Sequence, residues 1–287
     1  MNFSCQAEVF QLPHHRQYLI VSRNFMADTR TIWKNSFSTT AVPEWTCPTC
    51  EKGVLQALKK DYTVVESPSS KEARQHEAWE PEWISGHFTG LLKCSNEVCA
   101  DRIVIVGEMS MTEEPDYEDE YEGSGYGFKV VEVLSPTYFF PHLKIFQIHT
   151  DVPDEIKDAI NNSFKLYWVD TASCANKIRV VIELIMDEQK IQSTYIERRK
   201  RKIYSLHKRI EFFKVKKPDE GDLFMAIKWI GNSGSHKNED LTKDDLLDAY
   251  EILSHVTSKL YEKTTKRIKQ MTKKINKRKK PIGNKRT

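Results

Sequence analysis

Short runs of β-branched and aromatic residues mark the N-terminal half of the chain. They stand at residues 16–23, 101–109 and 127–136, and Gly, Pro or charged residues bound each run. Such runs predict β-strands. Residues 66–82 are polar and contain prolines, which predicts a projecting loop, and residues 113–127 predict a hairpin tip or a loop.

From about residue 154 the apolar positions change to a helical period. Ile156, Ile160 and Phe164 recur one turn apart, and Thr242 begins a later stretch as an N-cap followed by acidic residues. The pattern predicts five helices, over residues 154–167, 171–189, 196–213, 219–230 and 240–261. The sequence therefore predicts an α+β chain, with a β-rich domain at 1–140 and an α-helical bundle at 141–262.

Composition supports folded domains of this kind. The chain has 287 residues, of which 39% are hydrophobic and 30% charged, which suits two domains with real cores. No apolar run approaches the roughly 18–20 residues needed to cross a bilayer. The N-terminal stretch lacks the basic and apolar regions of a secretory signal, so we expect a cytoplasmic protein.

The net charge of +3 hides an uneven distribution. Residues 113–122 are mostly acidic, whereas residues 263–287 contain many lysines and arginines and no acidic residue. Both segments fit solvated, disordered chain. For the basic tail we also expect nucleic-acid binding without sequence reading, because phosphate backbones release counterions to such cations. The expected contacts are Lys273, Lys274, Lys277, Arg278, Lys279 and Lys280.

Four of the six cysteines form two short pairs. Cys47 and Cys50 stand in "EWTCPTCEKG", and Cys94 and Cys99 in "LLKCSNEVCADR". A CxxC turn places two thiolates on one side, with backbone amides aimed at the sulfurs, and two such turns supply the four soft ligands of tetrahedral zinc. The second pair, CxxxxC, is looser than usual, and 43 residues separate the pairs.

We therefore predict a zinc-ribbon domain at 1–140 with a structural zinc ion, because four cysteine ligands leave no coordination position open for water. Two alternatives stay open: four reduced thiols without a metal, and His76 or His87 in place of one cysteine ligand. Disulfides are disfavoured in the expected compartment. Cys5 and Cys174 lack sequence partners and are interpreted as core or surface residues.

The helical half resembles a known family, the domain of unknown function 4145, over roughly residues 140–262. The resemblance rests on "VPDEIKDAINNSFKLYWVDTASCANKIRVVIELIMDE" and "LFMAIKWIGNSGSHKNEDLTKDDLLDAYEILSHVTSKLY". The matching positions are Pro153, Arg179 with Glu183, Gly231, Asn232 and His236. Members are often attached to restriction-endonuclease subunits and other phage-defence proteins, so the resemblance implies a defence or toxin-type effector.

The family in turn is similar to the HEPN superfamily of helical bundles, which includes many metal-independent ribonucleases. Their signature is an Arg, four to six residues, then His, with Asn or another polar residue after the Arg. Cleavage through the RNA 2′-hydroxyl needs a group that exchanges protons near neutral pH and a cation for the phosphorane charge. Two copies usually face each other, so the resemblance implies a dimer that binds RNA more readily than DNA.

This sequence departs from that signature at one position, because Gly231 precedes Asn232 where the relatives have Arg. Lys228 lies one helical turn before Asn232, but a lysine is a point charge and not an equivalent replacement. Arg179 is the other candidate, although its spacing to Glu183 suggests a structural ion pair. Arg201 and His207 match the Arg–His spacing literally, as a cation-rich stretch easily can.

Two classes of function follow. In the first, an endoribonuclease uses His236 as general acid or base, Asn232 to orient the phosphate, and Lys228 or Arg179 to stabilise charge. In the second, the helical domain is a non-catalytic module that binds a partner protein, a nucleotide or nucleic acid in a defence or restriction complex. A third interpretation makes His236 only a polar residue at a helix end. No Walker loop, dinucleotide fingerprint or nucleophile elbow is present.

Overall fold

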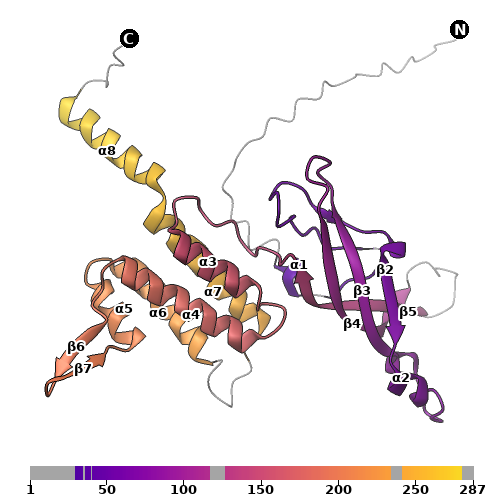
Figure 1. The fold of residues 1–287 in the computed structure, drawn as a ribbon. Coiled ribbons are helices and arrows are strands. Elements are labelled where there is room, and N and C mark those ends of the chain that lie inside the picture. Colours follow the sequence, from indigo (N-terminus) through magenta and orange to yellow (C-terminus); the bar gives the residue numbers. More distant parts are fainter. Residues whose placement is uncertain (1–29, 35, 40, 117–126, 234–240, 280–287) are drawn as a thin grey trace, which may run out of the picture.

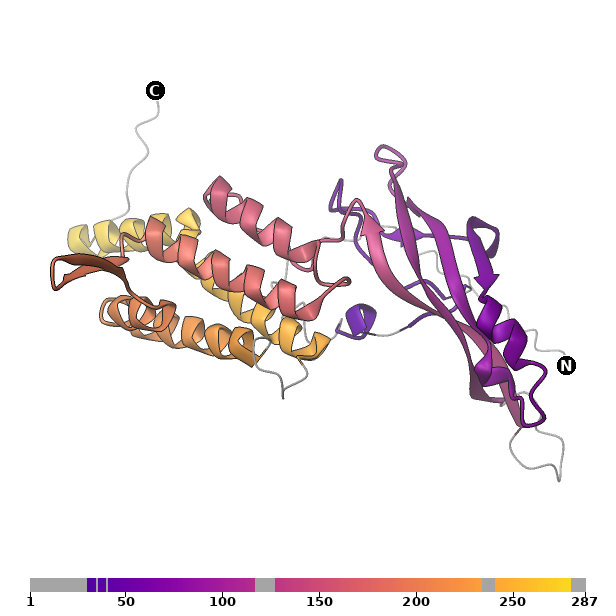
Figure 2. The ribbon, with the colours of Figure 1, turned by 60° about the horizontal axis from the view of Figure 1, so that its bottom comes forward.

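The computed structural model describes residues 30–34, 36–39, 41–116, 127–233 and 241–279 (Figure 1). A β-rich part lies at one end of an elongated molecule, and a helical part lies at the other (Figure 2). The predicted α+β class and its order along the chain are confirmed. None of the described helices is long and apolar enough to cross a membrane. The strand expected at 16–23 lies outside the described residues.

One antiparallel sheet forms the β-rich part. Its strands are β1 (Leu55–Gln56), β2 (Tyr62–Glu66), β3 (Ser85–Cys94), β4 (Arg102–Asp116) and β5 (Gly127–Phe140). The strand order is β1-β3-β4-β5, and β2 also pairs with β3. Along β3 the side chains alternate strictly between buried and exposed, so that Phe88 and Leu92 face the core. The strands predicted at 101–109 and 127–136 are confirmed.

The remaining short elements of this part are helical. They are α1 (Thr31–Lys34), the 3-10 turn η1 (Lys59–Asp61), α2 (Pro68–Ala73) and the 3-10 turn η2 (Pro81–Trp83). The prediction of a simple loop at 66–82 is wrong for residues 68–73. The Ser67 side chain accepts a hydrogen bond from the Ser70 amide, and Pro68 occupies the first helical position, two features that begin a helix.

Six helices form the other part of the molecule. They are α3 (Asp154–Phe164), α4 (Thr171–Glu188), α5 (Leu206–Lys214), α6 (Pro218–Ser233), α7 (Lys243–Tyr261) and α8 (Lys263–Arg278). Four of the five predicted helices are confirmed as α3, α4, α6 and α7. Thr242 caps α7 as predicted, in a reciprocal pair of hydrogen bonds with Asp245.

The prediction of one helix over 196–213 is wrong. The chain instead forms a hairpin, β6 (Thr194–Glu197) and β7 (Lys200–Ile203), and only then begins α5. Arg198 and Arg199 connect the strands with φ of 49° and 61°, the backbone that a tight two-residue hairpin turn requires. Tyr204, just after β7, stacks on Tyr195 at 4.5 Å between ring centroids and fixes the base of the hairpin.

The basic tail also differs from its prediction. Residues 263–278 form helix α8 in place of disordered chain, after a break at Glu262 (φ −59°, ψ 107°). The helix extends beyond the bundle (Figure 1). Ile268 and Met271 lie on one side of it, one turn apart, and are 50% and 42% exposed. The basic segment is therefore helical and carries two exposed apolar side chains on one side.

An aromatic cluster joins the two parts of the molecule. Trp168, at the α3–α4 connection, lies 6.2 Å from Trp45 and 5.2 Å from Phe139 of the β-rich part, measured between ring centroids. Trp33 of α1 makes an edge contact with Tyr167 at 6.3 Å and accepts a hydrogen bond from its hydroxyl through the backbone carbonyl at 3.1 Å. All five side chains are buried. The sheet and the bundle therefore share one core.

We expect Trp168→Ala to lower the free energy of unfolding by about 3–5 kcal/mol, because it removes a large buried ring. Urea denaturation followed by circular dichroism measures the change. The matched control is Trp83→Ala, since Trp83 is 42% exposed and lies outside the junction. Equal destabilisation by the two substitutions would contradict the role given to Trp168.

Candidate metal centre and candidate phosphate site

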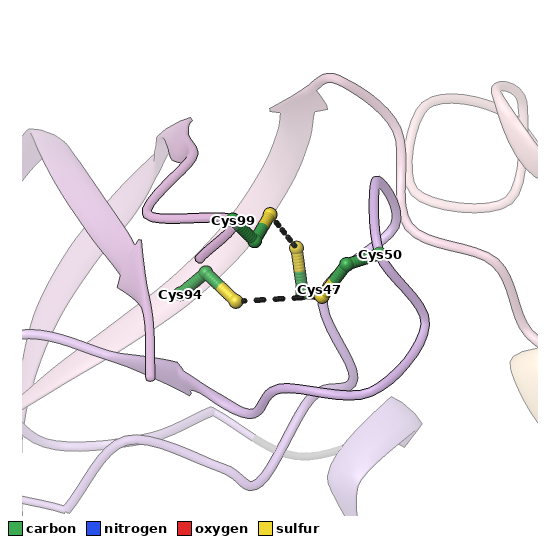
Figure 3. Close-up of side chains that lie close together, drawn as sticks. All are labelled: Cys47, Cys50, Cys94 and Cys99. Atoms are coloured by element: carbon green, nitrogen blue, oxygen red, sulfur yellow. Dashed lines mark hydrogen bonds between the residues drawn. The ribbon is translucent and has the colours of Figure 1, made fainter. Parts of the chain in front are cut away.

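The four paired cysteines come together at one end of the sheet (Figure 3). Cys47 and Cys50 lie in the loop before β1, Cys94 ends β3, and Cys99 lies in the turn before β4. All four sulfur atoms are within 4.8 Å of one another. The Sγ–Sγ distance is 3.9 Å for Cys47 and Cys99 and 3.6 Å for Cys50 and Cys94. Four sulfurs at about 2.3 Å from a tetrahedral zinc ion stand about 3.8 Å apart, which these distances resemble.

Backbone and side-chain amides point at the sulfurs. The amides of Gly53 and Asn96 donate to Cys50 and Cys94 respectively, each at 3.4 Å. Bonds from the Gly53 and Lys52 amides lower the pKa of Cys50 to about 6, whereas burial raises the pKa of Cys94 to about 12. A cation among the four sulfurs would favour the thiolate form of both groups.

The two turns have matching backbones. Glu51 and Ala100, which directly follow Cys50 and Cys99, both have positive φ, 54° and 47°. The Thr49 hydroxyl donates to the Asp101 carboxylate at 2.5 Å and ties one turn to the other. At Gly53 a Cβ atom would stand 2.4 Å from the Cys94 sulfur, so this position has no room for a side chain.

The predicted ligand set is therefore one cluster that could hold a metal ion, and the looseness of the CxxxxC pair does not prevent it. Among the described residues no histidine belongs to the cluster, so the alternative of a His76 or His87 ligand is not supported. Cys174 is buried in the helical part, where its sulfur lies 3.0 Å from the Tyr250 hydroxyl. Cys5 lies outside the described residues.

Two residues of neighbouring helices meet near the end of α6. Gly231, in the last turn of α6, packs against the side chain of Arg179 from α4. A Cβ at position 231 would lie only 2.7 Å from the Arg179 Cγ and Cδ atoms. The glycine therefore leaves room for the Arg179 side chain to pack against α6. This is the position at which the sequence lacks the arginine of similar families.

Lys228 adds a second cation to this place. Its residue is only 8% exposed, and its Nζ lies 3.4 Å from the centre of the Trp229 ring. Burial and the nearby charge of Arg179 lower the pKa of Lys228. The cation–π contact with Trp229 offsets part of the cost of burying this charge.

No carboxylate neutralises the pair within the described part of the chain. Neither Lys228 nor Arg179 takes part in the ion pairs found there, and the expected pair of Arg179 with Glu183 is absent among them. The Arg179 Nε atom is buried without a hydrogen-bond partner. Two adjacent cations with an unused donor suit an anionic group such as a phosphate, which accepts several charge-assisted hydrogen bonds. We name Arg179, Lys228 and Asn232 the cation site.

Two further side chains, Trp229 and His207, lie near the cation site. The sequence predicted a role at this site for neither of them. Trp229 is 55% exposed, and its ring centroid lies 6.0 Å from that of His207 at the start of α5. The His207 Nδ1 atom is buried without a partner, and its Nε2 lies 3.5 Å from Glu211. The only sequence signal for Trp229 is an aromatic residue directly after a lysine. Arg201, which matches the Arg–His spacing with His207, lies in the β6–β7 hairpin and donates to the Thr194 hydroxyl.

The other predicted site residues fall in two groups. His236 and Lys280 lie outside the described residues, although Ser233, the end of α6, is only three positions before His236. Lys273, Lys274, Lys277 and Arg278 are exposed on α8, and Lys279 follows directly with φ 49°. Four of the six cations expected to bind nucleic acid thus stand on a helix.

Exchanging a cysteine tests the metal centre. Cys94→Ser is expected to reduce the metal content of the purified protein strongly and to destabilise the β-rich part, since a hydroxyl is a poor replacement for a thiolate ligand. Metal analysis by mass spectrometry measures the content. Cys174→Ser, a buried cysteine outside the cluster, is expected to retain the metal. Equal metal content in Cys94→Ser and the unaltered chain would refute the site.

Lys228→Met tests the cost of the buried cation. The substitution keeps the length of the side chain and removes an unneutralised charge, so we expect it to increase the free energy of unfolding by about 1 kcal/mol. The folded-state pKa of Lys228 is lowered, so the penalty is full at neutral pH and shrinks as pH rises towards 10.5. Urea denaturation at pH 7 and pH 9.5 measures both effects. A destabilised variant would mean that Lys228 has a structural partner.

Comparison with known families finds a match for each of the two parts of the chain. Residues 161–278 match the family described as Domain of unknown function (DUF4145), so the resemblance found from the sequence is confirmed. The match ends at the last residue of α8. Residues 35–139 match another family, Domain of unknown function (DUF8608). Neither the curated proteins nor the solved structures contain a match.

Proposed function

Since residues 161–278 form a DUF4145 domain, we propose that it binds a backbone phosphate of RNA at the cation site and cleaves the RNA there. In this proposal His236 exchanges the proton, Arg179 and Lys228 stabilise the phosphate charge, and Asn232 orients the phosphate. The four-cysteine cluster holds zinc and stabilises the β-rich part. Two copies of the chain facing each other would build the complete cleft.

The observation that carries this proposal is the uncompensated charge of the cation site. Arg179 and Lys228 are adjacent, and within the described part of the chain neither forms an ion pair with a carboxylate. Two like charges that lie close together repel each other when no anion neutralises them. A phosphate would supply the missing negative charge. Neutralising the two cations would then contribute to the binding of the phosphate.

The proposed chemistry uses His236 together with the cations of the cation site. The RNA 2′-oxygen forms a bond to phosphorus while the bond from phosphorus to the 5′-oxygen breaks. A base takes the proton of the 2′-hydroxyl, and an acid gives a proton to the departing 5′-oxygen; His236 fits either role because imidazole titrates near neutral pH. Arg179 can donate two parallel hydrogen bonds to the charge that develops on the phosphate.

Helix α8 is suited to bind the same RNA on a surface outside the cation site. Lys273, Lys274 and Lys277 are exposed on it, and α8 contains no acidic residue. Cations along a projecting helix attract phosphate backbones without reading bases and add a salt-dependent contribution to affinity. Such a helix would gather RNA that the cation site then holds. A role in phage defence or as a toxin would follow from cleavage of cellular RNA.

A second candidate function is a non-catalytic binding subunit of a defence or restriction complex. Gly231 favours it, because the arginine of the catalytic signature is missing from that position. The Arg179 side chain packs against Gly231, but it comes from another helix, α4. In this candidate the cation site binds a phosphate group without cutting the chain.

RNA cleavage by the purified full chain tests the first candidate. His236→Ala is expected to lower the cleavage rate by about 10²–10⁴-fold, the usual contribution of general acid–base catalysis. Arg179→Lys is expected to lower the rate less, because a lysine retains the charge and loses the paired hydrogen bonds. A gel assay with end-labelled single-stranded RNA measures the rates.

The matched control is His255→Ala, which removes an exposed histidine of α7 and is expected to retain full activity. Cleavage that persists in His236→Ala would contradict the acid–base role. RNA binding that weakens in Lys228→Met, with no cleavage by the unaltered chain, would establish the second candidate. RNA binding that is the same in Lys228→Met and the unaltered chain would refute both.

A further inference from the structure

The β6–β7 hairpin projects from the helical part in both views (Figures 1 and 2). Its two strands form a sheet of their own, with four residue pairs from Thr194–Ile203 to Glu197–Lys200. Every residue from Ile196 to Ile203 is exposed. The ribbon therefore presents both faces and its tip to the surroundings.

Five consecutive cations occupy the tip and the second strand of this hairpin. They are Arg198, Arg199, Lys200, Arg201 and Lys202. The hairpin has one carboxylate, Glu197, which forms an ion pair with Lys202. Arg201 donates to the Thr194 hydroxyl, which leaves most of its guanidinium free for other acceptors. A strand pair with this density of exposed cations is suited to an anionic partner.

The residues of the hairpin turn also favour a function for this positive charge. Arg198 and Arg199 both adopt positive φ, a conformation for which two-residue turns prefer Asn and Gly. A side chain at these positions opposes the local backbone preference. Retaining two arginines there places charge at the outermost point of the ribbon at the expense of turn stability. The two arginines at the tip therefore favour a function that uses their positive charge.

One face of the ribbon also carries exposed apolar side chains. Ile196 is opposite Arg201, and Ile203 is opposite Thr194, so these four residues share a face. The two isoleucines are 79% and 80% exposed. Apolar groups between cations suit a surface that alternates phosphates with base edges, since a base edge offers apolar contacts such as the thymine methyl group.

We propose that the β6–β7 hairpin inserts into the major groove of double-helical DNA. Its arginines and lysines contact the phosphates on both sides of the groove, and Ile196 and Ile203 contact base edges at its floor. The major groove of B-form DNA, about 12 Å wide, admits a two-stranded ribbon, whereas the major groove of A-form RNA is too narrow for side chains to read. This surface is separate from the cation site and requires no RNA cleavage.

A charge exchange that favours the turn tests the proposal. Arg198→Asn combined with Arg199→Gly removes two cations and supplies the preferred turn residues, so the hairpin should stay folded. We expect the dissociation constant for a 20-base-pair DNA duplex to rise on the order of tenfold, and the slope of log affinity against log salt to fall by about 2. Fluorescence anisotropy of the full chain between 50 and 200 mM salt measures both.

Two further variants separate local from general effects. Lys60→Gln with Lys71→Gln removes the same charge from the exposed surface of the β-rich part and is expected to change duplex affinity little. Ile196→Thr with Ile203→Thr keeps the strand preference and the charge. It is expected to reduce the preference for duplex over single-stranded DNA and to leave the salt slope unchanged.

Several results would overturn the proposal. One is an unchanged salt slope in Arg198→Asn/Arg199→Gly, and another is an equal loss of affinity in the lysine control. Binding of an A-form RNA duplex as tight as that of DNA would exclude the groove assigned here. The RNA-cleavage proposal can be tested independently of this one. The hairpin variant should cleave single-stranded RNA normally, and His236→Ala should bind duplex DNA normally.

Discussion

The burial of Trp168 is the contact on which the arrangement of the whole molecule depends. Its ring lies between Trp45 and Phe139 of the β-rich part and Tyr167 of the helical part. Because these rings pack as one cluster, the sheet and the bundle cannot separate without exposing a large apolar area. Ion pairs of Arg30, directly before α1, with Asp248 and Glu251 of α7, at 2.7 and 2.6 Å, also connect the two parts. They add little energy, as partly exposed ion pairs do.

The cysteine cluster and the aromatic junction are physically connected. Trp45 stands two residues before Cys47, and its backbone carbonyl accepts the Leu55 amide that opens β1. The Cys47 amide in turn donates to Gly53, the residue whose missing side chain makes room for the Cys94 sulfur. A metal ion in the cluster would therefore hold the loop that positions Trp45 against Trp168. Its role would be to stabilise the interface between the two parts, at a distance from any chemistry.

The sequence predicts those features that depend on near neighbours. Alternation and a helical period locate β4, β5 and four helices, and the paired cysteines identify the cluster in spite of 43 intervening residues. The β6–β7 hairpin was missed because its exposed strands have no buried face to produce an alternating pattern, and because arginines occupy the turn where Asn-Gly would signal it. The contact of Arg179 with Gly231 joins two helices about fifty residues apart. No local pattern reveals such a contact, although the resemblance to the family had marked both positions.

At Gly231 the sequence lacks the arginine of the ribonuclease signature, and the absence of a side chain there leaves room for Arg179 of α4. A glycine inside a helix lowers its stability relative to alanine, so its presence near the end of α6 calls for a packing reason. The reason is the Arg179 side chain, whose Cγ and Cδ atoms occupy the space that any side chain at 231 would take. The stem of Arg179 is held between α4 and α6 by this packing. Lys228, one turn before Gly231 on α6, contacts the Trp229 ring, so the two helices together supply a pair of cations whose charge a phosphate would neutralise.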